Sequence, residues 1–265
     1  MAAVTGAWAD DLGLILDAAR QAGEVAMGFF GKSPEVGWTN EGRSPVSAAD
    51  YAANDRLEKL LRTARPDYGW LSEETEDDAA RLACETLFVV DPIDGTRAFI
   101  GGQATWCVSV AVVHRAKPVA GVLVAPALGE VFTAAAGLGA WKNDAAIAVA
   151  APAADGPVRL AAGEDIVSRI APGFRSPVER IGHVPSLAYR LAMVADGRID
   201  GTLVKKNSHD WDLAAADLIL SEAGGQLVGL DGRPLAYNRE GVAHDRLCAA
   251  RPPLLSPLLD SLRAI

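Results

Sequence analysis

The chain reads Asp91-Pro92-Ile93-Asp94-Gly95-Thr96 directly after the apolar run Leu87-Phe88-Val89-Val90. The apolar run predicts a buried strand, and Pro92, which has no N–H group, predicts that the chain leaves the sheet there. Gly95 permits a positive φ and Thr96 is a suitable N-cap, so a helix is expected to follow. Carboxylates bind hard cations, and a helix N-terminus binds phosphate oxygens. The stretch therefore predicts an α/β fold with both halves of a metal-dependent phosphate site, although a surface loop with solvated acids is the alternative for this motif alone.

Size and composition favour a cytoplasmic globular enzyme. The 265 residues are 50% hydrophobic and only 6% aromatic, which predicts one large domain, or two intimate ones, with a core of Ala, Val and Leu. No apolar run approaches the roughly 18 residues of a membrane span, and the N-terminus lacks the pattern of a secretory signal. The three cysteines have no C-x-x-C spacing, which argues against a disulfide framework or a zinc site.

The net charge of −9 disfavours binding to a nucleic-acid backbone. It does not exclude a small anionic substrate, because bound cations can reverse the local sign of the charge.

The remaining pattern alternates between helices and strands. An Ala- and Pro-rich stretch at 145–156 predicts the boundary between an N-terminal subdomain (1–150) and a C-terminal subdomain (151–265) of one compact unit. Helices are expected at 10–30, 44–65, 186–196, 211–223 and from 253 onwards, and strands at 87–90, 105–113, 119–124, 130–132, 199–204, 226–230 and 246–249.

Two further acidic clusters accompany the first. Asp212 lies in the first turn of an apolar helix whose residues Ala214, Ala215 and Ala216 predict very close packing. Its alternative role is a favourable interaction with the helix dipole. Glu73-Glu74 follows Ser72, and the alternative there is a solvated surface pair.

Together, four of these acids are consistent with a metal site. If they converge, they cannot all ionise without bound cations. Oxygen ligands without a nearby His or Cys favour magnesium over zinc. The four are Glu73, Asp91, Asp94 and Asp212.

These motifs resemble the inositol monophosphatase family of metal-dependent, lithium-sensitive phosphatases. The similarity rests on Ser72-Glu73-Glu74-Thr75, on the hexapeptide 91–96, and on Trp211-Asp212-Leu213-Ala214-Ala215-Ala216 followed by Glu222-Ala223-Gly224-Gly225. Their order and spacing fit across nearly the whole chain, with Ser72 where the family usually has Gly. The resemblance implies an αβαβα sandwich of the inositol monophosphatase and fructose-1,6-bisphosphatase type.

The resemblance also implies roles for individual residues, with two or three Mg²⁺ ions in the site. Glu73, Asp91 and the Ile93 carbonyl would hold one ion, and Asp91, Asp94 and Asp212 a second. The N–H groups of Gly95 and Thr96 would bind the substrate phosphate. The Thr96 hydroxyl and Asp50 would orient and deprotonate the attacking water, with Glu74 beside them.

The substrate is less defined than the chemistry. Inositol-specific relatives carry an acid where this chain has Lys205, followed by Lys206. Two cations cannot accept hydrogen bonds from a polyol, but they can bind a second anionic group. If the segment is a strand, Lys206 is expected on the opposite face. The run Thr96-Arg97-Ala98-Phe99-Ile100 resembles the bacterial 3′(2′),5′-bisphosphate nucleotidases more than the inositol enzymes. Arg97 lies beside the phosphate loop, and a role in substrate binding is predicted for it.

A bisphosphorylated nucleotide is therefore the first candidate for the small phosphate ester that this chain hydrolyses. Inositol 1-phosphate is the main alternative, and histidinol phosphate and a sugar bisphosphate follow. A regulatory role through a partner is a different class, against which the complete set of acids argues. A homodimer is left open as the assembly.

Overall fold

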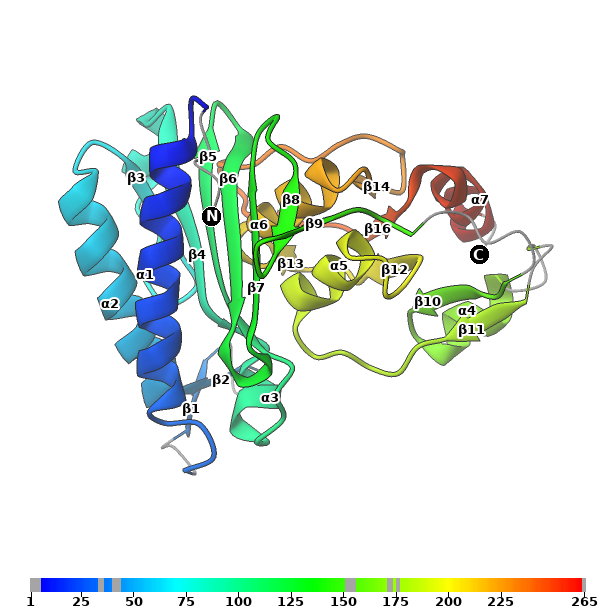
Figure 1. Ribbon diagram of the computed structural model, residues 1–265, viewed down its shortest axis with the longest axis horizontal. Helices are drawn as coiled ribbons and strands as arrows, with labels where there is room; N and C mark the ends of the chain where they lie inside the picture. Colours follow the sequence, from blue (N-terminus) through cyan, green and yellow to red (C-terminus); the bar gives the residue numbers. More distant parts are fainter. Residues whose placement is uncertain are drawn as a thin grey trace.

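The computed structural model describes residues 6–32, 36–39, 44–150, 156–170, 174 and 177–263, and it has an α/β architecture (Figure 1). No helix within these ranges is long and apolar enough to cross a membrane. The elements are, in chain order, α1 (Ala9–Met27), β1 (Val36–Thr39), β2 (Ser44–Ser47), α2 (Ala48–Ala64), β3 (Gly69–Ser72), η2 (Ala79–Ala83), β4 (Thr86–Asp94), α3 (Thr96–Ile100), β5 (Cys107–His114), β6 (Lys117–Ala125), η3 (Pro126–Leu128), β7 (Glu130–Ala135), β8 (Ala140–Lys142), β9 (Ala145–Ile147), β10 (Val158–Ala161), α4 (Glu164–Ile170), β11 (Val178–Arg180), α5 (Leu187–Ala195), β12 (Gly201–Val204), β13 (Ser208–His209), α6 (Asp210–Glu222), β14 (Gln226–Gly229), β15 (Ala243–His244), β16 (Leu247–Ala250) and α7 (Pro252–Arg263).

The larger sheet has seven strands in the order β3-β4-β5-β6-β7-β8-β9. Strands β3 and β4 are parallel, with Ser72 opposite Val90, and every later pair is antiparallel. Because β3 and β4 run in the same direction, the residues that follow them emerge at the same end of the sheet. This pairing brings the acids after β3 beside those at the end of β4.

Helices α1 and α2 cover one face of this sheet (Figure 1). Residues one helical turn apart, such as Ile15 and Ala19 in α1 or Leu57 and Leu61 in α2, pack on Phe88 and the valines of β4 to β6. The spacing follows from the period of the helix, which places residues three and four apart on one side.

Helices α5 and α6 form the middle layer, on the opposite face of the larger sheet. Here the prediction of very close packing around Ala215 is confirmed. A Cβ atom at Gly121 of β6 would lie only 2.9 Å from the carbonyl oxygen of Ala215, so a side chain there would collide with the helix backbone. The small residues of α6 therefore let the helix that carries Asp212 lie directly on the sheet that carries Asp91.

A five-stranded sheet, in the order β11-β10-β12-β16-β14, lies beyond these helices. One of its faces contributes Ala161, Val204 and Ala249 to the core shared with α5 and α6. Its other face packs on α4 and α7 through Leu160, Cys248 and Leu258. The order is helix, sheet, helix, sheet, helix, and the αβαβα sandwich is confirmed.

Two expectations about the first motif were wrong. Strand β4 does not end before Pro92, because it continues to Asp94 with a shift of register against β5 between Asp91 and Asp94. Proline is tolerated in a strand at such an irregularity. Thr96 is not the N-cap of the following helix, because Gly95 takes that position with a φ of 95° and Thr96 is the first residue of α3.

Other boundaries also differ from the predictions. Residues Ser44–Ser47 form β2, and α2 begins only at Ala48, because the backbone N–H and hydroxyl of Ser47 both donate to Asp50 and cap the helix. Strand β12 ends at Val204, so Lys205 and Lys206 do not alternate across a strand. The short elements β8 to β11 and α4 were not predicted. Residues 145–147 of the Ala- and Pro-rich stretch form β9, residues 151–155 lie outside the described ranges, and the division into subdomains stays a prediction.

Candidate active site

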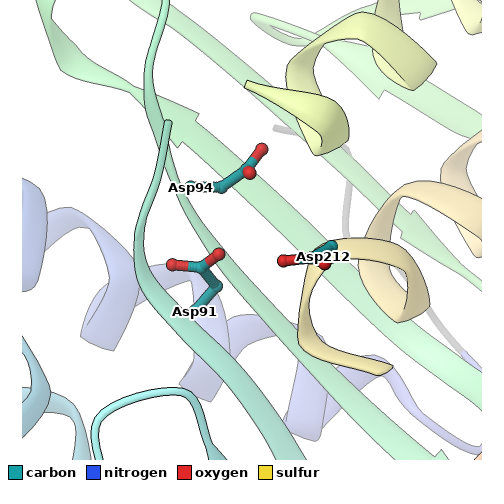
Figure 2. Close-up of side chains that lie close together, drawn as sticks. All are labelled: Asp91, Asp94 and Asp212. Atoms are coloured by element: carbon teal, nitrogen blue, oxygen red, sulfur yellow. The ribbon is translucent and has the colours of Figure 1, made fainter. Parts of the chain in front are cut away.

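Three carboxylates from two separate elements meet between the larger sheet and α6 (Figure 2). Asp91 and Asp94 come from the end of β4, and Asp212 comes from the first turn of α6. One oxygen atom of each lies within 4.8 Å of the others. A distance of this size fits ligands that share a cation, so the geometry makes a candidate metal site.

The irregular end of β4 places the carboxylates of Asp91 and Asp94 close to that of Asp212 (Figure 2). Within this turn the backbone N–H of Ile93 donates to Asp91 Oδ1 at 2.9 Å. Asp91 is only 1% exposed, so the turn keeps a carboxylate almost fully out of water. The burial of an acid without a cationic partner is costly, which is a reason to expect a function for it.

Asp94 is bound to the start of α5. Its Oδ2 atom accepts hydrogen bonds from the Ser186 hydroxyl and from the Ala188 N–H, the latter at 2.6 Å, and its Oδ1 atom lies 3.3 Å from the Leu187 N–H. A Cβ atom at Gly95 would lie 3.0 Å from the Cβ of Ser186, so glycine is required both for this close approach and for its positive φ. Asp94 thus links the end of β4 to the start of α5.

Asp212 is held by the capping of its own helix. The His209 N–H donates to Asp212 Oδ2 at 2.7 Å, and the His209 ring stacks on Trp211 with 4.6 Å between centroids. The carboxylate therefore satisfies a backbone donor at the start of α6 while it faces Asp91 and Asp94.

Glu73 and Glu74 follow β3 at the same end of the sheet. The Glu73 N–H donates to the Val90 carbonyl at 3.2 Å, which continues the parallel ladder for one more residue. Ser72, where a Gly was expected, is buried, and its hydroxyl donates to Asn54 Oδ1 at 2.7 Å. The Glu73 side chain is exposed and lies outside the group of three acids defined by the 4.8 Å distance.

The pKa values of Asp91 and Asp94 are both raised. Loss of hydration is the largest cause of the raised pKa of Asp91, and the charges of Glu73, Asp94 and Asp212 add to it. Loss of hydration and the charge of Asp212 raise the pKa of Asp94 to about 7, against the lowering effect of its hydrogen bonds to α5. A bound cation would remove this repulsion.

The pKa of Glu73 is also raised well above its usual value. Its surface is open to solvent, but dense protein around it reduces the hydration of the carboxylate, and the charges of Asp212 and Glu74 add to the shift. Glu73 lies outside the three clustered acids, but its charge is close enough to raise the pKa of Asp91.

Asp50, Thr96 and Ile93 form a separate hydrogen-bonded group beside the acids. The Thr96 hydroxyl lies 3.2 Å from Asp50 Oδ1 and 3.0 Å from the Ile93 carbonyl, and its single proton can be donated to one of them at a time. Burial raises the pKa of Asp50 despite hydrogen bonds from Ser47 and Thr96. Loss of hydration and the charge of Asp50 raise the pKa of Glu74 to about 7.

Two cavities adjoin the residues of the candidate site. One, of about 530 Å³, is lined by Glu73, Gly95, Thr96, Arg97 and His183, among others. A second, of about 560 Å³, includes Asp212 in its wall, and His183 lines both. The predicted phosphate-binding residues and two predicted metal ligands, Glu73 and Asp212, therefore line adjoining cavities.

The second cavity is strongly basic. Six Lys and Arg side chains line it against two Asp side chains, and the six are Arg169, Arg180, Arg190, Lys205, Lys206 and Arg246. Lys205 and Lys206 both line this cavity together with Asp212, and the binding role of Lys205 stays a prediction. Lys206 was expected on an opposite face only if the segment is a strand, and this condition is not met, because β12 ends at Val204 and a turn follows.

Arg190 and Ser208 in this cavity were missed by the sequence analysis. Within the described part of the chain, Arg190 Nε and Ser208 Oγ are buried and have no hydrogen-bond partner. The signal for Arg190 was present, because it is a charged residue inside the apolar helix Leu187–Ala195. Buried donors without partners are rare and call for an explanation such as a ligand.

Comparison with known proteins gives relatives of several specificities. The 3′(2′),5′-bisphosphate nucleotidase CysQ of Aggregatibacter actinomycetemcomitans is 31% identical over 247 residues, which cover 85% of this chain and 86% of the relative. The inositol-1-monophosphatase of Mesorhizobium japonicum is 33% identical over 235 residues, covering 83% and 86%. The histidinol-phosphatase of Chlorobaculum parvum is 30% identical over 238 residues, covering 88% and 90%.

A solved structure supports the same relationship. The extragenic suppressor protein suhB from Bartonella henselae superimposes with a TM-score of 0.84 at 29% identity, over 96% of this chain and 98% of that one. A sequence model of the inositol monophosphatase family matches residues 11–258, which is nearly all of the chain. With the αβαβα sandwich and the acid cluster in place, the chain belongs to the inositol monophosphatase family, a family of metal-dependent phosphatases.

Proposed function

We propose that this chain is a magnesium-dependent phosphomonoesterase whose preferred substrate carries a second anionic group, with a 3′(2′),5′-bisphosphate nucleotide as the first candidate. The observation that carries the proposal is the basic cavity of about 560 Å³ that begins at Asp212. A phosphate ester whose scissile group lies at the acids would extend its second charge into this cavity.

The donor set fits magnesium. The clustered ligands are carboxylate oxygens, which suit a hard cation. Glu73, Asp91 and the Ile93 carbonyl would hold one ion and Asp91, Asp94 and Asp212 a second, and two or three ions in total agree with this set. When bound, the ions supply positive charge that activates water and stabilises the leaving oxygen.

The remaining residues handle the phosphate and a proton. The N–H groups of Gly95 and Thr96, at the start of α3, would hold phosphate oxygens in the cavity that they line. The Thr96 hydroxyl, when it donates to Asp50 Oδ1, presents an oxygen lone pair that can accept a hydrogen bond from the attacking water, and the water proton can pass to this oxygen as the Thr96 proton passes to Asp50. The buried Asp50 carboxylate, with its raised pKa, is then suited to receive the proton. Glu74 is close enough to Asp50 for their charges to interact, and Arg97 lines the cavity with Gly95 and Thr96, where it could bind the phosphate.

The second anionic group has several donors available. Lys205 is exposed in the wall of the basic cavity, and the side chains of Arg190 and Ser208 line the same cavity. A hydrogen bond to a charged partner contributes roughly 1.5–3 kcal/mol. These contacts would favour a bisphosphate over a simple monophosphate, because Lys205 and Arg190 carry only donors and give the hydroxyl groups of an inositol ring no acceptor.

The test is a comparison of substrates and variants. We would measure kcat/KM with Mg²⁺ for adenosine 3′,5′-bisphosphate, inositol 1-phosphate, histidinol phosphate and a sugar bisphosphate. Lys205→Ala and Lys206→Ala should each lower kcat/KM for the nucleotide about ten- to a hundredfold and change that for inositol 1-phosphate little. Lys59→Ala, an exposed lysine of α2 on the far side of the molecule, is the matched control and should change neither.

The alternatives correspond to distinct results. Inositol 1-phosphate as the best substrate, with equal small effects of both lysine variants on all substrates, would make the chain an inositol-1-monophosphatase, as its 33% identical relative is named. A preference for histidinol phosphate or a sugar bisphosphate would assign those activities. If the protein hydrolyses none of these esters with Mg²⁺, the remaining candidate is a regulatory role through a binding partner. Whether the protein forms a homodimer is a separate question, which light scattering would answer.

A further inference from the structure

Residues 237–244 lie across the beginning of α6, outside the acid cluster itself. The Asp210 N–H donates to the Val242 carbonyl at 3.0 Å, and the Asn207 N–H donates to the His244 carbonyl at 2.9 Å. The short strands β13 and β15 pair in the same place, with Ser208 opposite His244. The turn that carries Asp212 is therefore supported from outside by this segment.

Asn238 is the residue of this segment with contacts on two sides. Its backbone N–H donates to Asp210 Oδ2 at 2.9 Å. Its side chain exchanges two hydrogen bonds with Arg81, from Asn238 Nδ2 to the Arg81 carbonyl at 3.2 Å and from Arg81 Nη1 to Asn238 Oδ1 at 2.8 Å. Its φ of 55° is left-handed, a conformation that Asn adopts more easily than most residues.

On one side, Arg81 belongs to the connection between the acids that follow β3 and the acids of β4. It lies in η2 and is only 3% exposed. Its guanidinium also donates to both oxygens of Asp77, at 2.6 and 2.8 Å, and to the Arg239 carbonyl at 3.0 Å. A buried guanidinium with four hydrogen bonds is held in one geometry, because the loss of its acidic partner would leave an uncompensated charge.

On the other side, Asp210 belongs to the same helical turn as Asp212. It is fully buried, and its Oδ1 atom lies 2.7 Å from His244 Nε2. Asp210 is thus held through both of its oxygens, by Asn238 and by His244. Asp212 lies two residues further along in the same turn, so the contacts that hold Asp210 also fix the backbone at Asp212.

We propose that Asn238 is a positioning residue that holds the first turn of α6, and with it Asp212, in register with the acids that follow β3 and end β4. It touches neither substrate nor cation. The inference rests on the proposed function, because it takes the three clustered acids as cation ligands. Outer partners of metal ligands typically contribute about ten- to a hundredfold to metal affinity or activity.

The test compares two asparagines with left-handed backbones. Asn143 has a φ of 46° and two side-chain hydrogen bonds, to the Val131 N–H and the Gly129 carbonyl, and it lies in the remote turn between β8 and β9. Asn238→Gly and Asn143→Gly both keep the backbone conformation and both lose a pair of hydrogen bonds. The readout is the Mg²⁺ concentration that gives half of the maximal rise in melting temperature, together with the Mg²⁺ dependence of kcat.

Asn238→Gly should raise the Mg²⁺ midpoint of thermal stabilisation at least about tenfold. It should raise the Mg²⁺ concentration for half-maximal activity in parallel, while kcat at saturating Mg²⁺ returns close to that of the wild type. Asn143→Gly should lower the melting temperature without a change in the midpoint. The same midpoint in both variants would overturn the positioning role.

A milder variant covers the case in which Asn238→Gly does not fold. Asn238→Asp keeps the backbone N–H to Asp210 and the acceptor for Arg81 but loses the donor to the Arg81 carbonyl, so its midpoint should move in the same direction by less. An unchanged midpoint in that variant contradicts the inference alone. A wild-type protein that Mg²⁺ does not stabilise contradicts the proposed function itself.

Discussion

The hydroxyl of Ser186 donates a hydrogen bond to Oδ2 of Asp94, a residue 92 positions earlier in the chain. The same Ser186 oxygen accepts a hydrogen bond from the Tyr189 N–H at 3.1 Å, so it is also the N-cap of α5. One side chain thus connects an acid of the larger sheet to the start of a helix in the middle layer. The position of the acid and the stability of the helix are coupled.

Ser186→Ala should therefore destabilise the protein. The loss of an N-cap serine costs about 0.5–2 kcal/mol, and the buried Asp94 carboxylate loses a donor as well. Urea unfolding with a chelator present would measure the change in free energy. Ser168→Ala, which removes an exposed hydroxyl of α4, is the control with little expected effect. Equal unfolding midpoints for the two variants would contradict the coupling.

Asp91→Asn should abolish phosphatase activity and leave the protein folded. Asp91 is almost fully buried among other acids, so removal of its charge should raise the melting temperature in the absence of metal. Turnover with Mg²⁺ and melting in EDTA are the two measurements. Near-normal turnover of Asp91→Asn would refute the assignment of Asp91 as a shared ligand.

Mg²⁺ should stabilise the wild-type protein, because cations relieve the repulsion among the clustered acids. At a hundredfold excess over Kd the gain is about 2.7 kcal/mol for each independent site. Thermal melts in EDTA and in saturating Mg²⁺ would measure it, and Asp91→Asn should respond much less. Identical melting temperatures of the wild type in both conditions would speak against cation binding by these acids.

Gly121→Ala should be destabilising by about 1–3 kcal/mol, as expected when a well-packed contact is overfilled. The new methyl group would lie 2.9 Å from the Ala215 carbonyl oxygen and push α6 away from β6. Activity should fall with stability, since α6 carries Asp212. Gly13→Ala, in an exposed position of α1 with no atom within 4 Å of the new Cβ, should be neutral or stabilising. A neutral Gly121→Ala would contradict the close packing.

Asp217→Asn should change how stability depends on pH. Loss of hydration raises the pKa of Asp217 to about 6, although the Tyr237 hydroxyl donates to it at 2.8 Å. A carboxyl with a raised pKa in the folded state contributes stability below its unfolded pKa of about 4, and this contribution disappears as the pH rises through about 6. The variant should therefore gain stability relative to the wild type between pH 4 and 7.

Melting temperatures across this pH range, with a chelator in both samples, would test the change at Asp217. Asp231→Asn, at an exposed carboxylate, should show no such pH-dependent gain. A constant difference between Asp217→Asn and the wild type at every pH would show that this carboxyl does not titrate as described.

The sequence predicted the parts of the fold that rest on long apolar patterns. The valines of β4 to β6 and the amphipathic α1 have the periods of a strand and of a helix, and they lie where expected. Short elements such as β10 and β11 have too few residues for a period to appear, and they exist because neighbouring strands supply their hydrogen bonds. Local pattern cannot reveal pairing of that kind.

In the site, too, local motifs were predictable from the sequence and tertiary contacts were not. The motifs around Asp91 and Asp212 pointed to the acids, because buried carboxylates in an apolar context are unusual. The start of α2 was misplaced although the capping-box spacing from Ser47 to Asp50 was present in the sequence. The place of Lys206 and the unpaired donor of Arg190 depend on how a turn and a helix meet at one cavity. Those facts are tertiary, so no local pattern could have supplied them.

The basic cavity has a consequence for how an anion approaches this protein. The whole chain carries a net charge of −9, so at long range it repels anions, whereas the Lys and Arg side chains of the cavity attract them at short range. At physiological ionic strength the Debye length is about 8 Å, which is comparable to the width of a cavity of about 560 Å³. Salt therefore screens the distant repulsion more than the contacts inside. Moderate salt should speed the encounter with an anionic ester, opposite to the behaviour of a uniformly basic protein.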